Sequence, residues 1–245
     1  MRIWLAILLG ITSLHCFAQA DYAREQRWAD EITPSILVGD PVQLALPAGR
    51  KFLGIYTPSD KARAGVVVVH GLGVHPDWGL INPLRSRLSE QGYATLSVQM
   101  PVMASDAPGS SYAPTFPEAA ERIAVAVNYL RGKGHKKIAI VSHSLGTRMA
   151  NVLLNQADAP SIDAWVAIGL SGDYTKAEMF KAPVLDLYGE KDLPAVLEAA
   201  AKRANAIRNI RGSAQIRVAG ADHFFNGLDN ELLRNVRLFL DRATK

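Results

Sequence analysis

Residues 137–146 read Lys-Ile-Ala-Ile-Val-Ser-His-Ser-Leu-Gly, an apolar run followed by a short turn and the start of a helical pattern. The apolar run predicts a buried strand that ends at the turn. A serine at the tip of such a turn projects its hydroxyl from the end of a sheet, where Oγ can reach a carbonyl carbon. Ser144 is therefore a candidate nucleophile. The alternative is a serine that only caps the N-terminus of the following helix.

The turn departs at one place from the Gly-x-Ser-x-Gly pattern of serine nucleophiles. Gly146 stands two residues after Ser144, but Ser142 stands where the first glycine is usual. Small side chains are needed at both places, because the backbone folds tightly around the serine. Serine is small enough for this turn, so the pattern is incomplete but the predicted conformation is still possible.

Outward from this turn, apolar strand-like runs alternate with helix-like segments along most of the chain. Strands are expected at residues 42–46, 52–56, 65–70, 94–98, 137–141, 164–170, 183–188 and 215–218, and helices at 23–32, 82–91, 117–131, 148–156, 194–208 and 230–240. The first two strands should form a hairpin. The rest predict an α/β fold with a mostly parallel central sheet and helices on both faces. A loop over residues 102–116 has no pattern of its own, and such loops often border a site.

Polar or glycine-rich turns follow several of these expected strands. Gly71-Leu-Gly73 follows the run 65–70, Asp192 follows 183–188 and His223 follows 215–218. Ligands bind outside the carboxyl ends of the strands in open α/β sheets. The three turns are therefore expected to meet Ser144 at one edge of the sheet.

His223 is the candidate base. A neutral imidazole titrates near working pH, so it can take the serine proton and later return it to a leaving group. The other histidines fit this role less well. His143 should point away from the serine side chain, His70 should organise the loop after its strand, and His75 and His135 lie in loops.

Asp192 is the candidate acid. A carboxylate at a strand end can accept the second ring N–H of a histidine, fix its tautomer and stabilise the imidazolium. Asp173, Glu190 and Asp222 are alternatives for this role. Asp222 is next to His223 in sequence and is too close to reach its ring well.

Backbone N–H groups are expected to form the oxyanion hole. The N–H of Leu145 begins a helix, whose dipole favours a developing negative charge. The loop Gly71-Leu-Gly73 should supply a second donor, for which Leu72 is the best candidate. The same glycines would also simply permit a tight turn, and both interpretations hold together.

The composition limits the other chemistry open to the chain. It has 245 residues, a formal net charge of +4 and one cysteine, Cys16. We find no metal-ligand spacing, dinucleotide fingerprint, phosphate-binding lysine turn or aromatic stacking platform. The basic run His135-Lys136-Lys137 fits a solvated strand start better than a nucleic-acid patch. No metal, no cofactor and no nucleic-acid partner are therefore expected.

Residues 1–20 have the pattern of a secretory signal peptide. Arg2 precedes an apolar run at 3–17, and Ala18-Gln-Ala20 fits a cleavage site before residue 21. The apolar run has 15 residues, whereas a membrane anchor, the alternative, needs roughly 20. We expect a signal peptide at 1–20, a single domain at 21–245, and export to the periplasm or the medium without a membrane span in the mature chain.

Two further consequences concern Cys16. A lipidated cysteine usually follows a small residue, and His15 is too large for that role. Cleavage before residue 21 would remove Cys16, so the mature chain would hold no disulfide and no thiol nucleophile.

With Ser144, Asp192 and His223 in that order, and His70-Gly-Leu-Gly73 upstream, the chain resembles the α/β-hydrolase superfamily over residues 42–240. It looks like the small esterase, dienelactone-hydrolase-like and thioesterase-like members, although dienelactone hydrolases proper use a cysteine as nucleophile. The short stretch at 171–182, before the acid-bearing strand, implies that there is no large cap domain and that the site is open.

The resemblance implies a serine hydrolase that cleaves carboxylic esters through an acyl-enzyme. Thioesters and amides use the same groups, so the bond type stays open, and the substrate is expected to be small or carried on a polymer. The alternative is a non-catalytic binding or assembly protein on the same fold, because a fold does not determine a function.

Overall fold

The computed structural model describes residues 20–245. The expected signal peptide, apart from Ala20, and Cys16 lie outside the described residues. None of the helices in the described part is long and apolar enough to cross a membrane.

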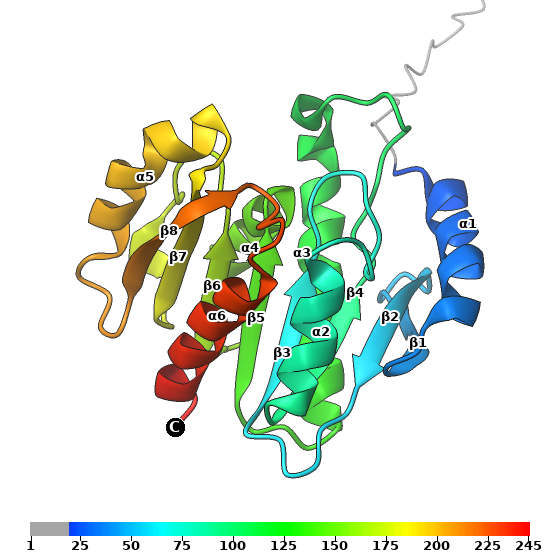
Figure 1. The fold of residues 1–245 in the computed structure, drawn as a ribbon. Coiled ribbons are helices and arrows are strands. Elements are labelled where there is room, and N and C mark those ends of the chain that lie inside the picture. Colours follow the sequence, from blue (N-terminus) through cyan, green and yellow to red (C-terminus); the bar gives the residue numbers. More distant parts are fainter. Residues whose placement is uncertain (1–19) are drawn as a thin grey trace, which may run out of the picture.

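Within residues 20–245, eight strands form one sheet in the order β1-β2-β4-β3-β5-β6-β7-β8 (Figure 1). Their bounds are β1 Asp40–Ala45, β2 Lys51–Thr57, β3 Ala64–Val69, β4 Tyr93–Val98, β5 Ile138–His143, β6 Ala164–Ile168, β7 Val184–Lys191 and β8 Ala214–Asp222. The hairpin β1–β2 joins β4 in antiparallel register, and every later pairing is parallel.

Six α-helices accompany the sheet in the described residues. They are α1 Tyr22–Ile32, α2 Ile81–Glu90, α3 Phe116–Gly132, α4 Leu145–Leu154, α5 Pro194–Ile207 and α6 Asp229–Ala243. In Figure 1, α2 and α6 lie in front of the sheet, with α3 and α4 behind it. The predicted mostly parallel sheet with helices on both faces is confirmed.

The β-branched run of β3 shows why this sheet is buried on both faces. Val66 and Val68 belong to the core under α2 and α6, and Val67 and Val69 belong to the core under α3 and α4. Successive side chains of a strand point to opposite faces, so a strand covered twice must be apolar at every position. All four valines are fully buried.

One connection differs from the sequence prediction, and a second agrees with it. The loop expected at 102–116 contains a 3₁₀ helix, η2 Gly109–Thr115, so part of it has regular structure. Residues 169–183 between β6 and β7 hold one 3₁₀ turn, η3 Ala177–Met179. No large cap domain therefore stands between these strands, as the sequence predicted.

Candidate active site

Four of the expected site residues directly follow the last residue of a strand. His70 directly follows β3, Ser144 follows β5, Asp192 follows β7 and His223 follows β8. Because parallel strands end at the same side of a sheet, all four lie on one edge, which we call the carboxyl edge.

Ser144, His223 and Asp192 form a continuous hydrogen-bonded chain. Ser144 Oγ lies 2.9 Å from His223 Nε2, and His223 Nδ1 lies 2.6 Å from Asp192 Oδ1. His223 and Asp192 are buried, whereas Ser144 is half-buried. The Ser144 hydroxyl thus lies at the solvent end of this series of hydrogen bonds, and the Asp192 carboxylate lies at the buried end.

The backbone at Ser144 adopts a conformation that is unusual for a residue with a side chain. Its φ is 55° and its ψ is −123°. Ser144 N donates to Ile168 O at 2.8 Å, and Ser144 O accepts from Thr147 N at 3.0 Å. Such backbone conformations cost about 1–3 kcal/mol and persist where the surroundings fix them, often at functional sites. The conformation is that of a nucleophile elbow.

The glycines around Ser144 are explained by close contacts with the loop after β3. A Cβ on Gly146 would lie 2.2 Å from His70 O, so this position cannot hold a side chain. A Cβ on Gly71 would lie 3.1 Å from Ser144 Cβ. The loop after β3 therefore packs directly on the elbow.

Ser142, at the position where glycine is usual, has a packing role of its own. It belongs to β5 and is buried, and its Oγ accepts a hydrogen bond from Trp165 Nε1 at 2.9 Å. The same hydroxyl donates to Val166 O at 3.2 Å. The departure from the pattern thus gives a buried indole N–H its acceptor and leaves the turn at Ser144 intact.

The environment of Asp192 favours its charged form. Burial alone would raise the pKa of this carboxyl, but hydrogen bonds from His223, Gly189 N and Leu193 N outweigh it, and the pKa lies below its usual range. The two backbone donors lie 3.1 and 2.8 Å from the carboxylate oxygens. Asp192 is therefore ionised at neutral pH and can stabilise an imidazolium at His223.

The alternative acids bind other groups. Asp173 pairs with Lys202, Glu190 with Arg217 and Asp222 with Asn226. Asp222 also accepts from Phe224 N at 3.0 Å and so shapes the turn that carries the histidine. Of the candidate acids, Asp192 is the one that the structure joins to His223.

No role was predicted for His143, yet this side chain contacts the site. Its Nε2 donates to His223 O at 3.0 Å, and the two rings lie 4.8 Å apart. Burial, together with a smaller effect of the neighbouring His223, lowers the pKa of His143 to about 4. A neutral His143 therefore holds the backbone of His223, a role that only the folded chain reveals.

His70 organises the loop after β3, as expected. Its Nδ1 donates to Gly71 O at 2.9 Å, and its Nε2 accepts from Met100 N at 2.9 Å. Burial lowers the pKa of His70 to about 3, so the ring is neutral. His70 thus ties the glycine turn to the segment that follows β4.

The two expected oxyanion donors lie on neighbouring segments. Leu145 is the first residue of α4, and its N–H has no carbonyl one turn earlier in the helix. Leu72 follows Gly71, which packs against Ser144, and within residues 20–245 the Leu72 N–H donates to no backbone carbonyl. Both N–H groups thus lack a backbone acceptor within residues 20–245, as a donor to an oxyanion must.

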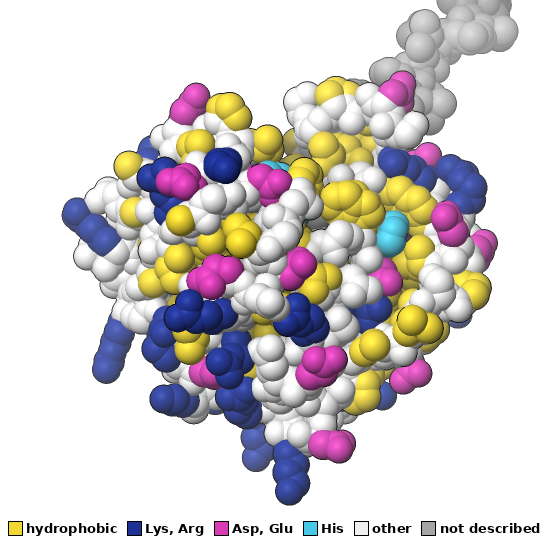
Figure 2. Space-filling model, viewed as in Figure 1, with side chains coloured by type: hydrophobic (Ala, Val, Ile, Leu, Met, Phe, Trp, Pro, Cys, Tyr) yellow, Lys and Arg dark blue, Asp and Glu magenta, His cyan; other side chains and the backbone are white. Residues whose placement is uncertain are grey.

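Apolar side chains surround the site on the surface. Leu72, Trp78, Leu193 and Phe224 are exposed, although all four are large and hydrophobic. In Figure 2, apolar side chains gather on the upper half of the molecule, where Figure 1 has the loops of the carboxyl edge. In the part of the chain that the structure describes, no cluster of His, Cys, Asp or Glu could hold a metal ion.

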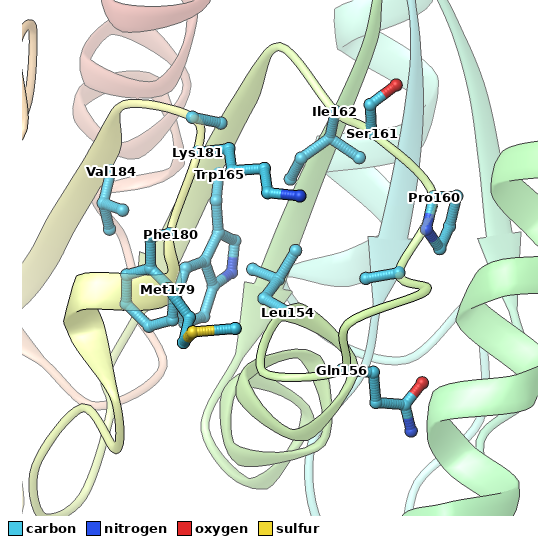
Figure 3. A pocket seen from close by; sticks show the side chains of 12 residues that line it. Leu154, Gln156, Pro160, Ser161, Ile162, Trp165, Met179, Phe180, Lys181 and Val184 are labelled. Atoms are coloured by element: carbon cyan, nitrogen blue, oxygen red, sulfur yellow. The ribbon is translucent and has the colours of Figure 1, made fainter.

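A small pocket lies near the amino ends of β6 and β7 (Figure 3). Leu154, Met179 and Phe180 lie around the indole of Trp165, which also bonds Ser142. Its volume of about 60 Å³ is far below the roughly 300–1,000 Å³ of ligand sites. This pocket is a gap in the packing around Trp165, and it is too small for a substrate.

The sequence matches one described family. The profile of a family of proteins of unknown function, DUF3530, matches residues 22–121. That range includes the His70 loop but ends before Ser144, Asp192 and His223. No curated protein matches the chain.

Solved structures resemble most of the chain at low sequence identity. A putative α/β hydrolase of unknown function from Agrobacterium tumefaciens is 20% identical, with a TM-score of 0.62 over 82% of this chain and 95% of that one. An esterase from Pyrococcus furiosus is 14% identical, with a TM-score of 0.67 over 84% of this chain and 93% of that one. A dienelactone hydrolase from Anabaena variabilis is 18% identical, with a TM-score of 0.66 over 84% of this chain and 97% of that one. The chain has the α/β-hydrolase fold.

Proposed function

We propose that the protein is a serine hydrolase that cleaves carboxylic esters through an acyl-enzyme. One observation carries the proposal: the unbroken chain of hydrogen bonds Ser144–His223–Asp192, with separations of 2.9 and 2.6 Å. These distances are within the reach that proton transfer between a nucleophile and its base requires. The esterases among the structural neighbours support the same reaction class.

In the first half of the reaction, Ser144 Oγ attacks the ester carbonyl carbon while His223 Nε2 takes the hydroxyl proton. Asp192 stabilises the resulting imidazolium. The N–H groups of Leu72 and Leu145 bind the oxyanion of the tetrahedral intermediate. His223 then gives its proton to the alcohol oxygen as the C–O bond breaks, which releases the alcohol and leaves Ser144 acylated.

In the second half, water replaces the alcohol. His223 takes a proton from the attacking water, and the new tetrahedral intermediate again places its negative charge at Leu72 and Leu145. When the bond to Ser144 Oγ breaks, His223 returns the proton to the serine, and the carboxylic acid leaves. The short β6–β7 connection leaves the site open, which suits small esters as well as esters carried on a polymer.

The proposal can be tested with a fluorophosphonate probe, which reacts with activated serines. The wild type should be labelled, and Ser144→Ala should not. Ser110→Ala is the matched control, since Ser110 is exposed in η2 and has no hydrogen bond to Ser144, His223 or Asp192. Labelling of Ser144→Ala at the wild-type rate would refute the assignment.

A non-catalytic protein on this fold is the alternative function. It would be favoured by separations beyond about 5 Å between the serine, the histidine and the acid, because proton transfer then fails. No observation on the described residues favours it.

We also propose that the enzyme is exported after cleavage between Ala20 and Asp21. Asp21 caps α1, since its Oδ1 accepts a hydrogen bond from Arg24 N at 2.9 Å, so cleavage there leaves the whole helix in the mature chain. Expression of the full chain in a Gram-negative host should give a periplasmic or secreted product whose first residue is Asp21. N-terminal sequencing checks this, and a product that keeps Met1 would contradict it.

A further inference from the structure

A second cleft opens beside His223 at the carboxyl edge. It lies between the loop after β3, the start of α2 and the loop after β8, and it is lined by Trp78, Leu80, Pro83, Phe224 and Asp229 among others. Its volume is about 540 Å³. This value falls within the roughly 300–1,000 Å³ of small-molecule sites.

Two exposed aromatic rings connect this cleft to the catalytic histidine. The Phe224 ring lies 5.0 Å from the His223 ring and 5.5 Å from the Trp78 ring, between centroids. Trp78 is 37% exposed and Phe224 is 41% exposed. Large aromatic side chains gain free energy when they are buried, so an exposed pair beside a catalytic base is suited to contact a ligand.

The reaction decides which part of an ester reaches this cleft. In the proposed mechanism, His223 Nε2 gives its proton to the oxygen of the departing alcohol. That oxygen must therefore lie near His223, and the alcohol must extend past the histidine. Phe224 is the next residue in the chain, and its ring separates His223 from Trp78.

We propose that the cleft lined by Trp78 and Phe224 binds the alcohol part of the ester, and that this alcohol is an apolar group that carries a ring and no negative charge. The inference rests on the proposed function. The rings, Leu80 and Pro83 supply apolar contact surface. Among the described residues that line the cleft, the one charged side chain is the acidic Asp229, and none is Lys or Arg, so an anionic alcohol would be repelled.

The first test compares benzyl acetate with ethyl acetate. Both substrates deliver the same acyl group and release a primary alcohol, so their ratio of kcat/KM reports the contact with the alcohol. Trp78→Ala should lower the benzyl-to-ethyl ratio by about fivefold, the effect expected from one lost aromatic contact, and Trp78→Phe should restore most of it. Leu238→Ala removes an equally exposed apolar side chain from α6 and should leave both rates unchanged.

The second test concerns charge. 4-(Acetoxymethyl)benzoate adds a carboxylate to the benzyl group and should be a poorer substrate than benzyl acetate. Asp229→Asn should reduce this discrimination, because it removes the facing negative charge. Equal discrimination in Asp229→Asn and the wild type would contradict the assigned charge preference.

Two results would overturn the proposal while the proposed function stood. One is a benzyl-to-ethyl ratio that does not change in Trp78→Ala. The other is a fall in kcat/KM of Trp78→Ala for ethyl phenylacetate, which carries the ring on the acyl side, with no fall for benzyl acetate.

Failure of the proposed function would be recognised separately, as labelling that persists in Ser144→Ala. In that case, binding to the cleft can still be tested by adding benzyl alcohol to the protein and following its NMR spectrum. The indole N–H resonance of Trp78, assigned by its absence in Trp78→Phe, should shift on binding. An unmoved resonance would overturn the inference whatever the protein's activity.

Discussion

Ser142 and Ser144 show how two identical side chains two residues apart serve different ends. Ser144 has a φ of 55°, which turns its side chain out of the sheet direction toward His223. Ser142 lies within β5, and its hydroxyl faces the Trp165 indole. The strain of the turn is thus confined to Ser144, and the preceding strand stays regular up to His143.

Replacing Ser142 with glycine should destabilise the fold while the activity of each folded molecule is kept. The change removes the acceptor of a fully buried indole N–H, which costs about 1–3 kcal/mol, and it adds glycine to a strand interior, which costs about 0.5–1 kcal/mol. Urea denaturation should therefore show a loss of about 1.5–4 kcal/mol in the free energy of unfolding. Glycine is usual at this position, so kcat should stay near the wild-type value.

A double-mutant cycle with Trp165→Phe isolates the hydrogen bond. Phenylalanine removes the indole N–H, so the further cost of Ser142→Gly should shrink in that background by about 1 kcal/mol or more. Equal costs of Ser142→Gly in the two backgrounds would show that the hydrogen bond contributes nothing to stability.

At the scale of elements, α1 braces the loops of the carboxyl edge. Arg24 Nη1 donates to Met103 O at 2.7 Å, and Arg24 Nη2 donates to Gly73 O at 3.2 Å. Its guanidinium also lies over the Trp28 ring, 4.4 Å from the centroid. One side chain thus joins the loop that carries Leu72 to the loop that follows β4.

A second contact of α1 anchors the helix itself. Glu25 pairs with Arg122 of α3 at 2.8 Å, and both residues are buried. Glu25 Oε1 also accepts from Val102 N at 3.3 Å. Removal of one member of a buried pair leaves the other charge without a partner, so Arg24, at the partly exposed surface, is the better residue for testing the brace.

Arg24→Ala should lower kcat by about threefold to tenfold with little change in KM. The loss of the Gly73 contact lets the Leu72 N–H move, and removal of a whole oxyanion donor costs about 10²–10³ in kcat, so a displaced donor should cost a fraction of that. Steady-state kinetics on one ester checks the result. Arg27→Ala, an exposed arginine on the same helix, is the control. An unchanged kcat in Arg24→Ala would show that α1 does not position the oxyanion loop.

For the whole molecule, the repeating patterns of the sequence were enough to predict the sheet, its helices and the edge where the site lies. The valines of β3 could belong only to a strand covered on both faces, and the positions of Ser144, Asp192 and His223 after strands followed from the chain order. The bond from Trp165 to Ser142, the hold of His143 on His223 and the reach of Arg24 to Gly73 could not be predicted. Each depends on side-chain directions and on distances between segments far apart in sequence, about which periodicity says nothing.

Burial of two neutral histidines links the carboxyl edge to the stability of the whole chain. The pKa values of His70 and His143 fall from 6.5 to about 3 and about 4 in the folded state, chiefly through burial. Protons therefore bind the unfolded chain more readily, and stability rises with pH wherever the unfolded state holds more protons. The contribution of these histidines is complete above pH 6.5 and is lost as the pH falls toward 4.

The stability of the wild type should thus fall steeply with acidification from pH 6 to pH 4.5. His143→Gln removes one of the two titrating rings and can still offer an N–H to His223 O. The variant should therefore take up about one proton fewer on unfolding. The slope of its free energy of unfolding against pH should be smaller by about 1.4 kcal/mol per pH unit. Urea denaturation at several pH values measures both slopes. Burial also raises the pKa values of the Glu25 and Asp186 carboxyls, but these groups are common to both proteins, so their effect cancels in the difference. Parallel curves for the two proteins would mean that His143 is charged in the folded state, and that it cannot be the neutral donor that holds His223.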